Sequence, residues 1–146
     1  MKKAQMIDVG EKERTKRLAR AQAYVRLNRE IVRKIKANTI PKGNVLEYAR
    51  IAGILAVKKT PELIPLTHSI EIDYAGIDFS IKADGILIES LVKAYAKTGV
   101  EMEALVGCCA AALTIYDMCK MFSRPIEIGK ICLLEKRGGK SGDYVK

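Results

Sequence analysis

Aromatic residues are scarce in this sequence of 146 residues, and their scarcity disfavours one common use of small basic domains. The chain has no tryptophan and two phenylalanines, Phe79 and Phe122. Small α+β domains that bind RNA stack bases on aromatic side chains of their strands. No segment of this chain has that aromatic-rich pattern, so its composition argues against a nucleic-acid-binding module.

Long uncharged segments and closely spaced cysteine pairs are also missing. The longest run without a charge, Ala104 to Tyr116, is shorter than the roughly 18 residues of a membrane-spanning helix. The start, MKKAQMIDVG, has no apolar stretch behind its two lysines and does not predict a secretory signal. We therefore expect a cytoplasmic protein without a membrane partner. The four cysteines form no C-x-x-C pair, which disfavours a metal site and predicts reduced thiols: Cys108, Cys109, Cys119 and Cys132.

Positive charge is concentrated near the N-terminus. Residues 1–42 contain 13 Lys and Arg against 4 Asp and Glu, a net charge of +9, whereas residues 43–146 contain 13 of each sign. Such a segment attracts polyanions, and nucleic acid, an anionic membrane surface and a nucleoside triphosphate are all candidates at this point. The length predicts a single domain over 1–146, with a mobile basic segment 1–16 and a mobile Gly-rich tail 137–146.

The periodicity of apolar residues predicts an α+β fold. Alternation predicts strands over 19–27, 68–81, 86–94 and 126–134. Helical patterns follow Asn28 and Asn44 as N-caps, and a long apolar helix is predicted over 98–120. This order predicts a ferredoxin-like antiparallel sheet with helices packed on one face and one additional helix. Glycine and proline refine it: Thr60-Pro61 should end the second helix, Ala75-Gly76 should form a bulge, Asp84-Gly85 should form a hairpin, and Gly129 should interrupt the last strand.

The helix predicted over 98–120 is charged at both ends. The helix dipole favours Glu101 and Glu103 in its first turn and Lys120 near its last turn, but it does not favour Asp117. Asp117 and Lys120 are three residues apart, which allows either a surface ion pair or an acid and a base presented together. Glu101 and Asp117 are separated by roughly 24 Å of helix, at about 1.5 Å per residue. Both ends can serve one small ligand only if two copies of the chain meet.

His68 and Lys42 lie in predicted loops, and each has two interpretations. His68 follows a proline-containing loop at the start of a strand, where it is either a structural residue or a ligand contact. Lys42 precedes a helix N-terminus, where it is either solvated or part of an anion site. The sequence GGKSG, residues 138–142, does not meet the spacing of a phosphate-binding P-loop.

Three long segments resemble one known family. They are KGNVLEYARIAGILAVKKTPELIPLTHSI, KTGVEMEALVGCCAAALTIYDMCK and RGGKSGDY. They resemble the molybdenum cofactor biosynthesis protein C family, the cyclic pyranopterin monophosphate synthases, from about Arg17 to Tyr144. The resemblance implies that 3',8-cyclo-7,8-dihydroguanosine triphosphate is converted to cyclic pyranopterin monophosphate with loss of diphosphate. It also implies hexamers, built as trimers of dimers, with the site between subunits.

By position, the resemblance implies a set of site residues. Asp117 matches the family's catalytic aspartate, Lys120 the lysine one turn on, and Lys42 the lysine of the family's KGD stretch. The substrate-binding positions that it implies are Leu66, Thr67, His68, Glu101, Met102, Glu103, Lys136 and Arg17. Several cations suit a triphosphate, and staged proton transfers suit a ring rearrangement.

The chain departs from the family at two of these places. Thr67-His68-Ser69 stands where Cys-His-Pro is common, so no thiol can act there, and Asn44 stands where the family has aspartate. No cofactor is expected other than Mg²⁺ accompanying the substrate triphosphate. Two alternatives stay open: a nucleic-acid-binding module, and a structural hexamer in which Asp117 and Lys120 are irrelevant to turnover.

Overall fold

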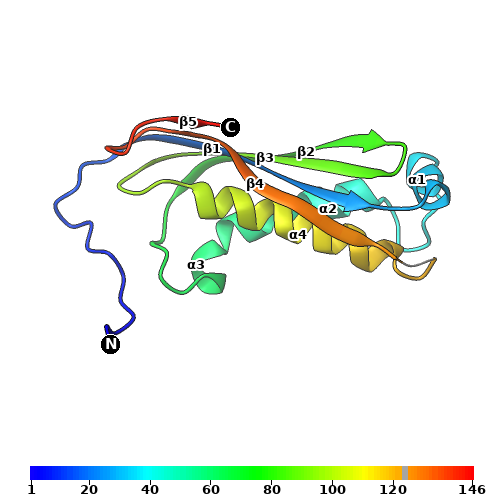
Figure 1. The fold of residues 1–146 in the computed structure, drawn as a ribbon, viewed down its shortest axis with the longest axis horizontal. Coiled ribbons are helices and arrows are strands. Elements are labelled where there is room, and N and C mark those ends of the chain that lie inside the picture. Colours follow the sequence, from blue (N-terminus) through cyan, green and yellow to red (C-terminus); the bar gives the residue numbers. More distant parts are fainter. Residues whose placement is uncertain (123–124) are drawn as a thin grey trace.

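The structure is a computed structural model that describes residues 1–122 and 125–146. The chain folds into an antiparallel sheet covered by helices (Figure 1). Along the sequence the elements are β1 (Thr15–Arg26), α1 (Arg29–Lys36), α2 (Val45–Lys58), α3 (Thr60–Leu63), β2 (Ile72–Lys82), β3 (Gly85–Ala96), α4 (Glu101–Cys119), β4 (Glu127–Arg137) and β5 (Tyr144–Val145).

The sheet has the strand order β2-β3-β1-β4-β5, and every neighbouring pair is antiparallel. The helices α2 and α4 cover the same face, with α4 packed on β1 and β3 and α2 packed on β2 (Figure 1). This confirms the predicted α+β, ferredoxin-like arrangement with helices on one face.

Small side chains let α4 approach the centre of the sheet. In β1 every second residue from Ala19 to Val25 is fully buried, and three of these four are alanines. The facing side of α4 is also built from small buried residues, among them Ala104, Gly107 and Ala111. Burial of this apolar surface at close packing is the main favourable contribution to the fold.

A contact between two glycines brings α2 against α4. A Cβ atom on Gly53 would lie 3.0 Å from the carbonyl oxygen of Gly107 and 2.9 Å from Ile77 Cγ1. A Cβ atom on Gly107 would lie 2.8 Å from Val57 Cγ2. The two helices can therefore be this close only because both positions lack a side chain.

The predicted N-caps are confirmed. The side chain of Asn28 accepts a hydrogen bond from the backbone N–H of Ile31 at 2.8 Å, and that of Asn44 accepts one from the N–H of Glu47 at 3.2 Å. Each bond satisfies a donor that the first turn of a helix would otherwise leave without an intrahelical partner. The starts of α1 and α2 are thus determined by local sequence.

Several predicted boundaries were wrong. The second strand begins at Ile72 rather than at residue 68, and its register shift lies between Ile72 and Tyr74 rather than at Ala75-Gly76. Pro61 does follow the end of α2, but it also lies in the first turn of the short helix α3, which the sequence pattern did not predict. Proline is tolerated there because its missing N–H has no partner in a first turn.

The hairpin and the last strand also differ in detail. The predicted hairpin is present, but its loop is Ala83 and Asp84, since Lys82 pairs with Gly85. The last strand runs over Glu127–Arg137, and its positive φ lies at Lys130, beside the Gly129 that was expected to interrupt it. Residues 123–124, which precede the last predicted strand, lie outside the described residues.

The Gly-rich tail adds a strand to the sheet. Tyr144 and Val145 form β5, which pairs with Lys136 and Glu135 of β4. Three glycines of the tail, Gly138, Gly139 and Gly142, have positive φ, which lets the chain reverse direction there. Mobility of the tail and of residues 1–16 stays a prediction.

Among the helices of the described residues, α4 is the one that is long and apolar enough to cross a membrane. In the fold it is the core helix, packed against the sheet and against α2, with Cys108, Ala112 and Ile115 fully buried. The apolar side chains of α4 are thus packed inside the protein, because a helix that is apolar on several faces is equally suited to a protein core.

Candidate functional site

Three of the predicted site residues meet at the C-terminal end of α4. The carboxylate of Asp117 accepts from Lys42 Nζ at 3.0 Å through one oxygen and lies 3.2 Å from Lys120 Nζ through the other. Lys42 Nζ also donates to the backbone carbonyl of Asp117 at 3.1 Å. All three side chains are at least 40% exposed, so the cluster is open to a ligand.

The two lysines determine the charge state of Asp117. Hydrogen bonds from Lys42 and then from Lys120 hold the pKa of Asp117 below its ordinary value. The group is therefore a carboxylate at neutral pH, held between two cations. The ion pair that the spacing of Asp117 and Lys120 allowed is formed, and both side chains are exposed. Their role as an acid and a base stays a prediction.

Lys42 reaches Asp117 because the turn before α2 directs it there. Gly43, with φ of 117°, follows the lysine and donates its N–H to the carbonyl of Ile40 at 3.0 Å. Asn44 then caps α2, so the residue that departs from the family's aspartate has a structural role in this chain. The amine of Lys42 points to α4 rather than completing an anion site at the start of α2.

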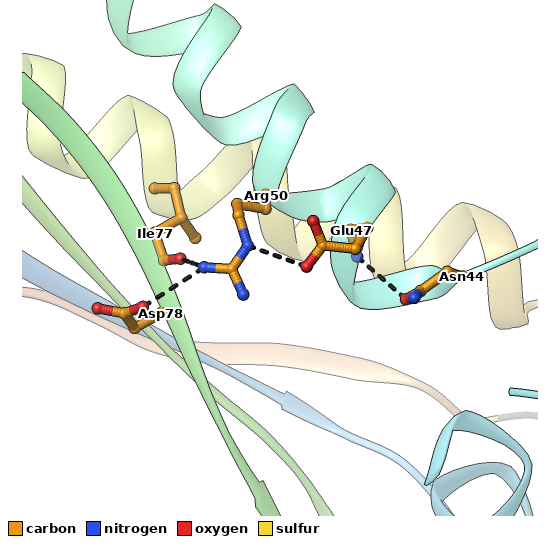
Figure 2. Close-up of polar contacts among 5 residues, drawn as sticks. All are labelled: Asn44, Glu47, Arg50, Ile77 and Asp78. Atoms are coloured by element: carbon orange, nitrogen blue, oxygen red, sulfur yellow. Dashed lines mark hydrogen bonds and ion pairs between the residues drawn. The ribbon is translucent and has the colours of Figure 1, made fainter. Parts of the chain in front are cut away.

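An arginine in the second turn of α2 joins this helix to the sheet. Arg50 pairs with Glu47 at 3.2 Å, donates to the carbonyl oxygen of Ile77 and lies 3.4 Å from a carboxylate oxygen of Asp78 (Figure 2). Figure 2 shows the arginine side chain extending from α2 to β2, with Glu47 between it and the Asn44 cap at the start of the helix. The start of α2, and with it Lys42, is held against the sheet by this network.

The N-terminal end of α4 forms a second group of predicted residues around a cavity of about 160 Å³. Glu103 is 2% exposed, and its burial raises the pKa of its carboxyl, with the nearby charge of Glu101 acting in the same direction. The cavity is lined by Thr67, His68, Ile70, Thr98, Gly99, Glu101, Met102 and Glu103. Five of these eight were predicted as substrate contacts. Ile70, Thr98 and Gly99 were not, although Thr98 and Gly99 lie just ahead of Val100, the N-cap of α4, where backbone N–H groups commonly face a ligand.

Two predicted cations do not line this cavity but contact the first turn of α4 or the loop before it. Lys136 Nζ lies 3.7 Å from Glu101 Oε1 and donates to Ser141 Oγ at 2.7 Å. Arg17 is 6% exposed, and its guanidinium donates to the backbone carbonyls of Lys97, Ala96 and Gly138 at 3.0, 3.4 and 3.4 Å. Arg17 thus ties β1 to the loop before α4 and to the Gly-rich turn, and its role toward phosphates stays a prediction.

The remaining predicted contacts lie in the loop before β2. Thr67 donates its hydroxyl to the carbonyl of Ile64 at 2.9 Å, which closes a turn after α3. His68 Nε2 lies 2.7 Å from the carbonyl oxygen of Ile7. Leu66 is 48% exposed and does not line the cavity.

The two groups do not meet within one chain. Glu101 begins α4 and Asp117 lies in its last turn, and these ends point to opposite ends of the molecule (Figure 1). Within the described residues, no three His, Cys, Asp or Glu side chains are placed to hold a metal ion. The structure therefore presents a charged pole around Asp117 and a cavity pole around Glu103.

Comparisons with known proteins agree on one family. A family profile described as the MoaC family matches residues 6–139. A cyclic pyranopterin monophosphate synthase of Geotalea uraniireducens is 51% identical over 141 residues, which cover 95% of this chain and 88% of that protein. Proteins of the same name from Roseiflexus sp. and Geobacter metallireducens are 47% and 49% identical, over 98% and 97% of this chain and 92% and 90% of their own lengths.

These matches span both poles of the site and every element from β1 to β4, so they concern the whole fold and not a shared motif. They agree with the resemblance of the three segments quoted from the sequence. The chain therefore belongs to the MoaC family.

Proposed function

We propose that this protein is a cyclic pyranopterin monophosphate synthase, a lyase of molybdenum cofactor biosynthesis. Its substrate is 3',8-cyclo-7,8-dihydroguanosine triphosphate, and its products are cyclic pyranopterin monophosphate and diphosphate. The observation that carries the proposal is the carboxylate of Asp117 held between Lys42 and Lys120, at the positions that match the family's catalytic aspartate and its lysines. Relatives at 47–51% identity carry the name of this enzyme.

The cluster is suited to proton transfer beside a phosphate. Asp117 is ionised at neutral pH and accepts a proton from the reacting ring or from a hydroxyl. Lys42 and Lys120 donate hydrogen bonds and balance the charge that develops on the leaving diphosphate. Mg²⁺ would arrive with the triphosphate, since proteins usually bind it through substrate phosphates and one or two carboxylates.

The cavity pole is suited to holding the substrate. Glu103 and His68 line a space next to the cation Lys136, which adjoins Glu101. Burial raises the pKa of the Glu103 carboxyl, so it keeps its proton to higher pH than an exposed glutamate does, which suits it to donate a hydrogen bond to the ring. We assign Leu66, Met102 and Arg17 to the same pole as substrate contacts.

A complete site requires two copies of the chain, which we propose to be arranged as a trimer of dimers. An apolar stripe on the outer face of α2 supports association: Tyr48, Ile51 and Leu55 are 56%, 62% and 52% exposed at helical spacing. Leu113 of α4 is 61% exposed. Exposed stripes of this kind are typical of surfaces that a partner covers. If the outer helical faces of two copies pack antiparallel, the Asp117 pole of one copy meets the Glu103 pole of the other.

The first test replaces the carboxylate. Purified protein is incubated with the cyclised GTP intermediate, and formation of diphosphate and pterin is measured for the wild type and for Asp117→Asn. We expect kcat to fall by about 10²- to 10⁴-fold, the range for a lost proton-transfer group, with substrate binding retained. Asp73→Asn is the matched control, since it removes the same charge from an exposed position of β2. Full activity in Asp117→Asn would contradict the proposal.

The second test decides whether two copies share a site. Asp117→Asn and Glu103→Gln proteins are each inactive in this scheme, and they are mixed under conditions that allow subunit exchange. Random mixing leaves about one site in four with both wild-type groups, so about a quarter of wild-type activity returns. If no activity returns although the subunits have exchanged, the two poles do not act in one shared site.

We also propose that the chain works as a single domain in the cytoplasm, without nucleic-acid or membrane partners. Sedimentation would show the hexamer, and a salt-dependent gel shift with mixed RNA would expose any nucleic-acid binding by the basic residues 1–42.

A further inference from the structure

The chain before β1 lies over the cavity pole and is attached there by main-chain carbonyls. We call residues 6–10, MIDVG, the strap. The carbonyl oxygen of Ile7 lies 2.7 Å from His68 Nε2, and that of Gly10 accepts from Lys97 Nζ at 3.3 Å. This segment lies at the end of the molecule where α4 begins (Figure 1). The family match begins at residue 6, so the strap lies inside the region common to the family.

The contact with Ile7 determines which ring nitrogen of His68 carries hydrogen. A carbonyl oxygen can only accept, so the hydrogen bond requires Nε2–H on the imidazole. While the strap is in place, this donor is occupied and cannot serve a substrate. The strap and any substrate acceptor directed at Nε2 therefore compete for one N–H group.

The strap has few other attachments: Val9 is half-buried, and its carbonyl accepts from the N–H of Lys12 at 3.1 Å. Met6 and Ile7 are 46% and 73% exposed, so their side chains bury little apolar surface. The carboxylate of Asp8 accepts from the N–H of Gly10 at 2.8 Å, a bond inside the strap that shapes it without attaching it. Segments with few buried apolar contacts open at low free-energy cost. The strap can be released without disturbing the sheet, which begins at Thr15.

His68 stands between two hollows of the surface. One, of about 310 Å³, lies on the strap side and is lined by Val9 and Arg14 as well as His68. The other is the cavity of about 160 Å³ that contains Glu103. A single imidazole thus borders both the strap and the cavity pole.

We propose that the strap is a latch that engages Nε2–H of His68 in the empty protein and is displaced by the substrate. A phosphate or enolate oxygen is a stronger acceptor than a neutral carbonyl, so the exchange is favourable once the substrate is in place. The role of His68 as the contact that is exchanged rests on the proposed function. The contact between the strap and His68 in the empty protein does not.

The first experiment therefore needs no substrate. His68 is the single histidine of the chain, so ¹H–¹⁵N spectra optimised for imidazole report on it alone. We compare the full chain with a variant lacking residues 2–10 and with a control lacking residues 2–5, which removes Lys2 and Lys3 but keeps the strap. We expect a hydrogen-bonded, slowly exchanging Nε2–H in the full chain and the control and its loss in the longer deletion. The same spectrum in all three proteins would overturn the latch.

The second experiment measures turnover. If the latch is closed in about nine molecules of ten, its removal lowers KM by about 10-fold and leaves kcat unchanged, because apparent affinity scales with the competent fraction. Asp8→Ala, which loses the bond shaping the strap, should lower KM in the same direction, and it covers the case in which the deletion fails to fold. An unchanged KM overturns the latch, and so does a fall in kcat, which would make the strap a positioning element for His68. If the full chain itself makes no product, the proposed function fails, and the spectra alone decide whether the strap engages His68.

Discussion

The contact between Gly53 and Gly107 allows a stability change to be worked out from the structure. In Gly53→Ala the new methyl group would lie 3.0 Å from the carbonyl oxygen of Gly107 and 2.9 Å from Ile77 Cγ1. The carbonyl belongs to the backbone of α4 and cannot move aside by a change of rotamer, so α2 must shift outward. Overpacking of a core costs about 1–3 kcal/mol, whereas replacing a helical glycine by alanine gains about 1 kcal/mol. The upper part of the first range applies here, and we expect a net loss of about 1–2 kcal/mol.

Thermal unfolding measures this loss. For a chain of this size the loss corresponds to a Tm lower by about 2–8 °C, compared at one protein concentration because association also shifts Tm. Gly129→Ala is the control, since a Cβ atom there would meet nothing within 4 Å and its φ is not positive. The control should keep its Tm or gain slightly. If Gly53→Ala is as stable as the control, α2 and α4 are not in the contact described.

Two further predictions concern the charges of the two poles. Lys42→Met removes the first cause of the low pKa of Asp117, so that pKa should rise, and the acid limb of kcat/KM should move to higher pH. A carboxyl ¹³C titration of Asp117 checks this. Lys120→Met should raise the pKa of Asp117 by less. An unchanged titration in Lys42→Met would contradict the contact between Lys42 and Asp117. Glu103→Gln should abolish turnover and should also raise Tm at pH 7. Burial raises the pKa of Glu103, so the stability that its acid form contributes is lost as pH rises through that value, and glutamine avoids this loss. The gain should vanish near pH 4, and a lower Tm at pH 7 would show that the carboxylate is stabilised in the fold.

Much of the fold was predictable because its signals are local. Every second residue of β1 is buried, and most of these are alanines. The side chains of Asn28 and Asn44 cap the starts of α1 and α2. The boundaries of β2 and β4 were less predictable, since a strand continues for as long as its neighbour offers partners. Pairing of β4 with β1 carries β4 on to Arg137, past the last apolar residue of its pattern.

The site was predictable in part. The resemblance named Asp117, Lys120 and Lys42, and helical spacing predicted that the first two share a face. That Lys42 reaches Asp117 across 75 residues of sequence followed from no local pattern. The position of Arg17, buried against three carbonyls, likewise depends on the loop and the turn that surround it.

Residue types and their spacing therefore determined the class of fold, the caps, and the charges at the two ends of α4, because each depends on a few neighbouring residues. Tertiary structure alone decided which groups meet: the Lys42–Asp117 contact, the buried environment of Glu103 and the strap on His68. The physical reason is that pKa shifts and hydrogen bonds act within a few ångströms of space, and only packing brings residues that are distant in sequence within that range.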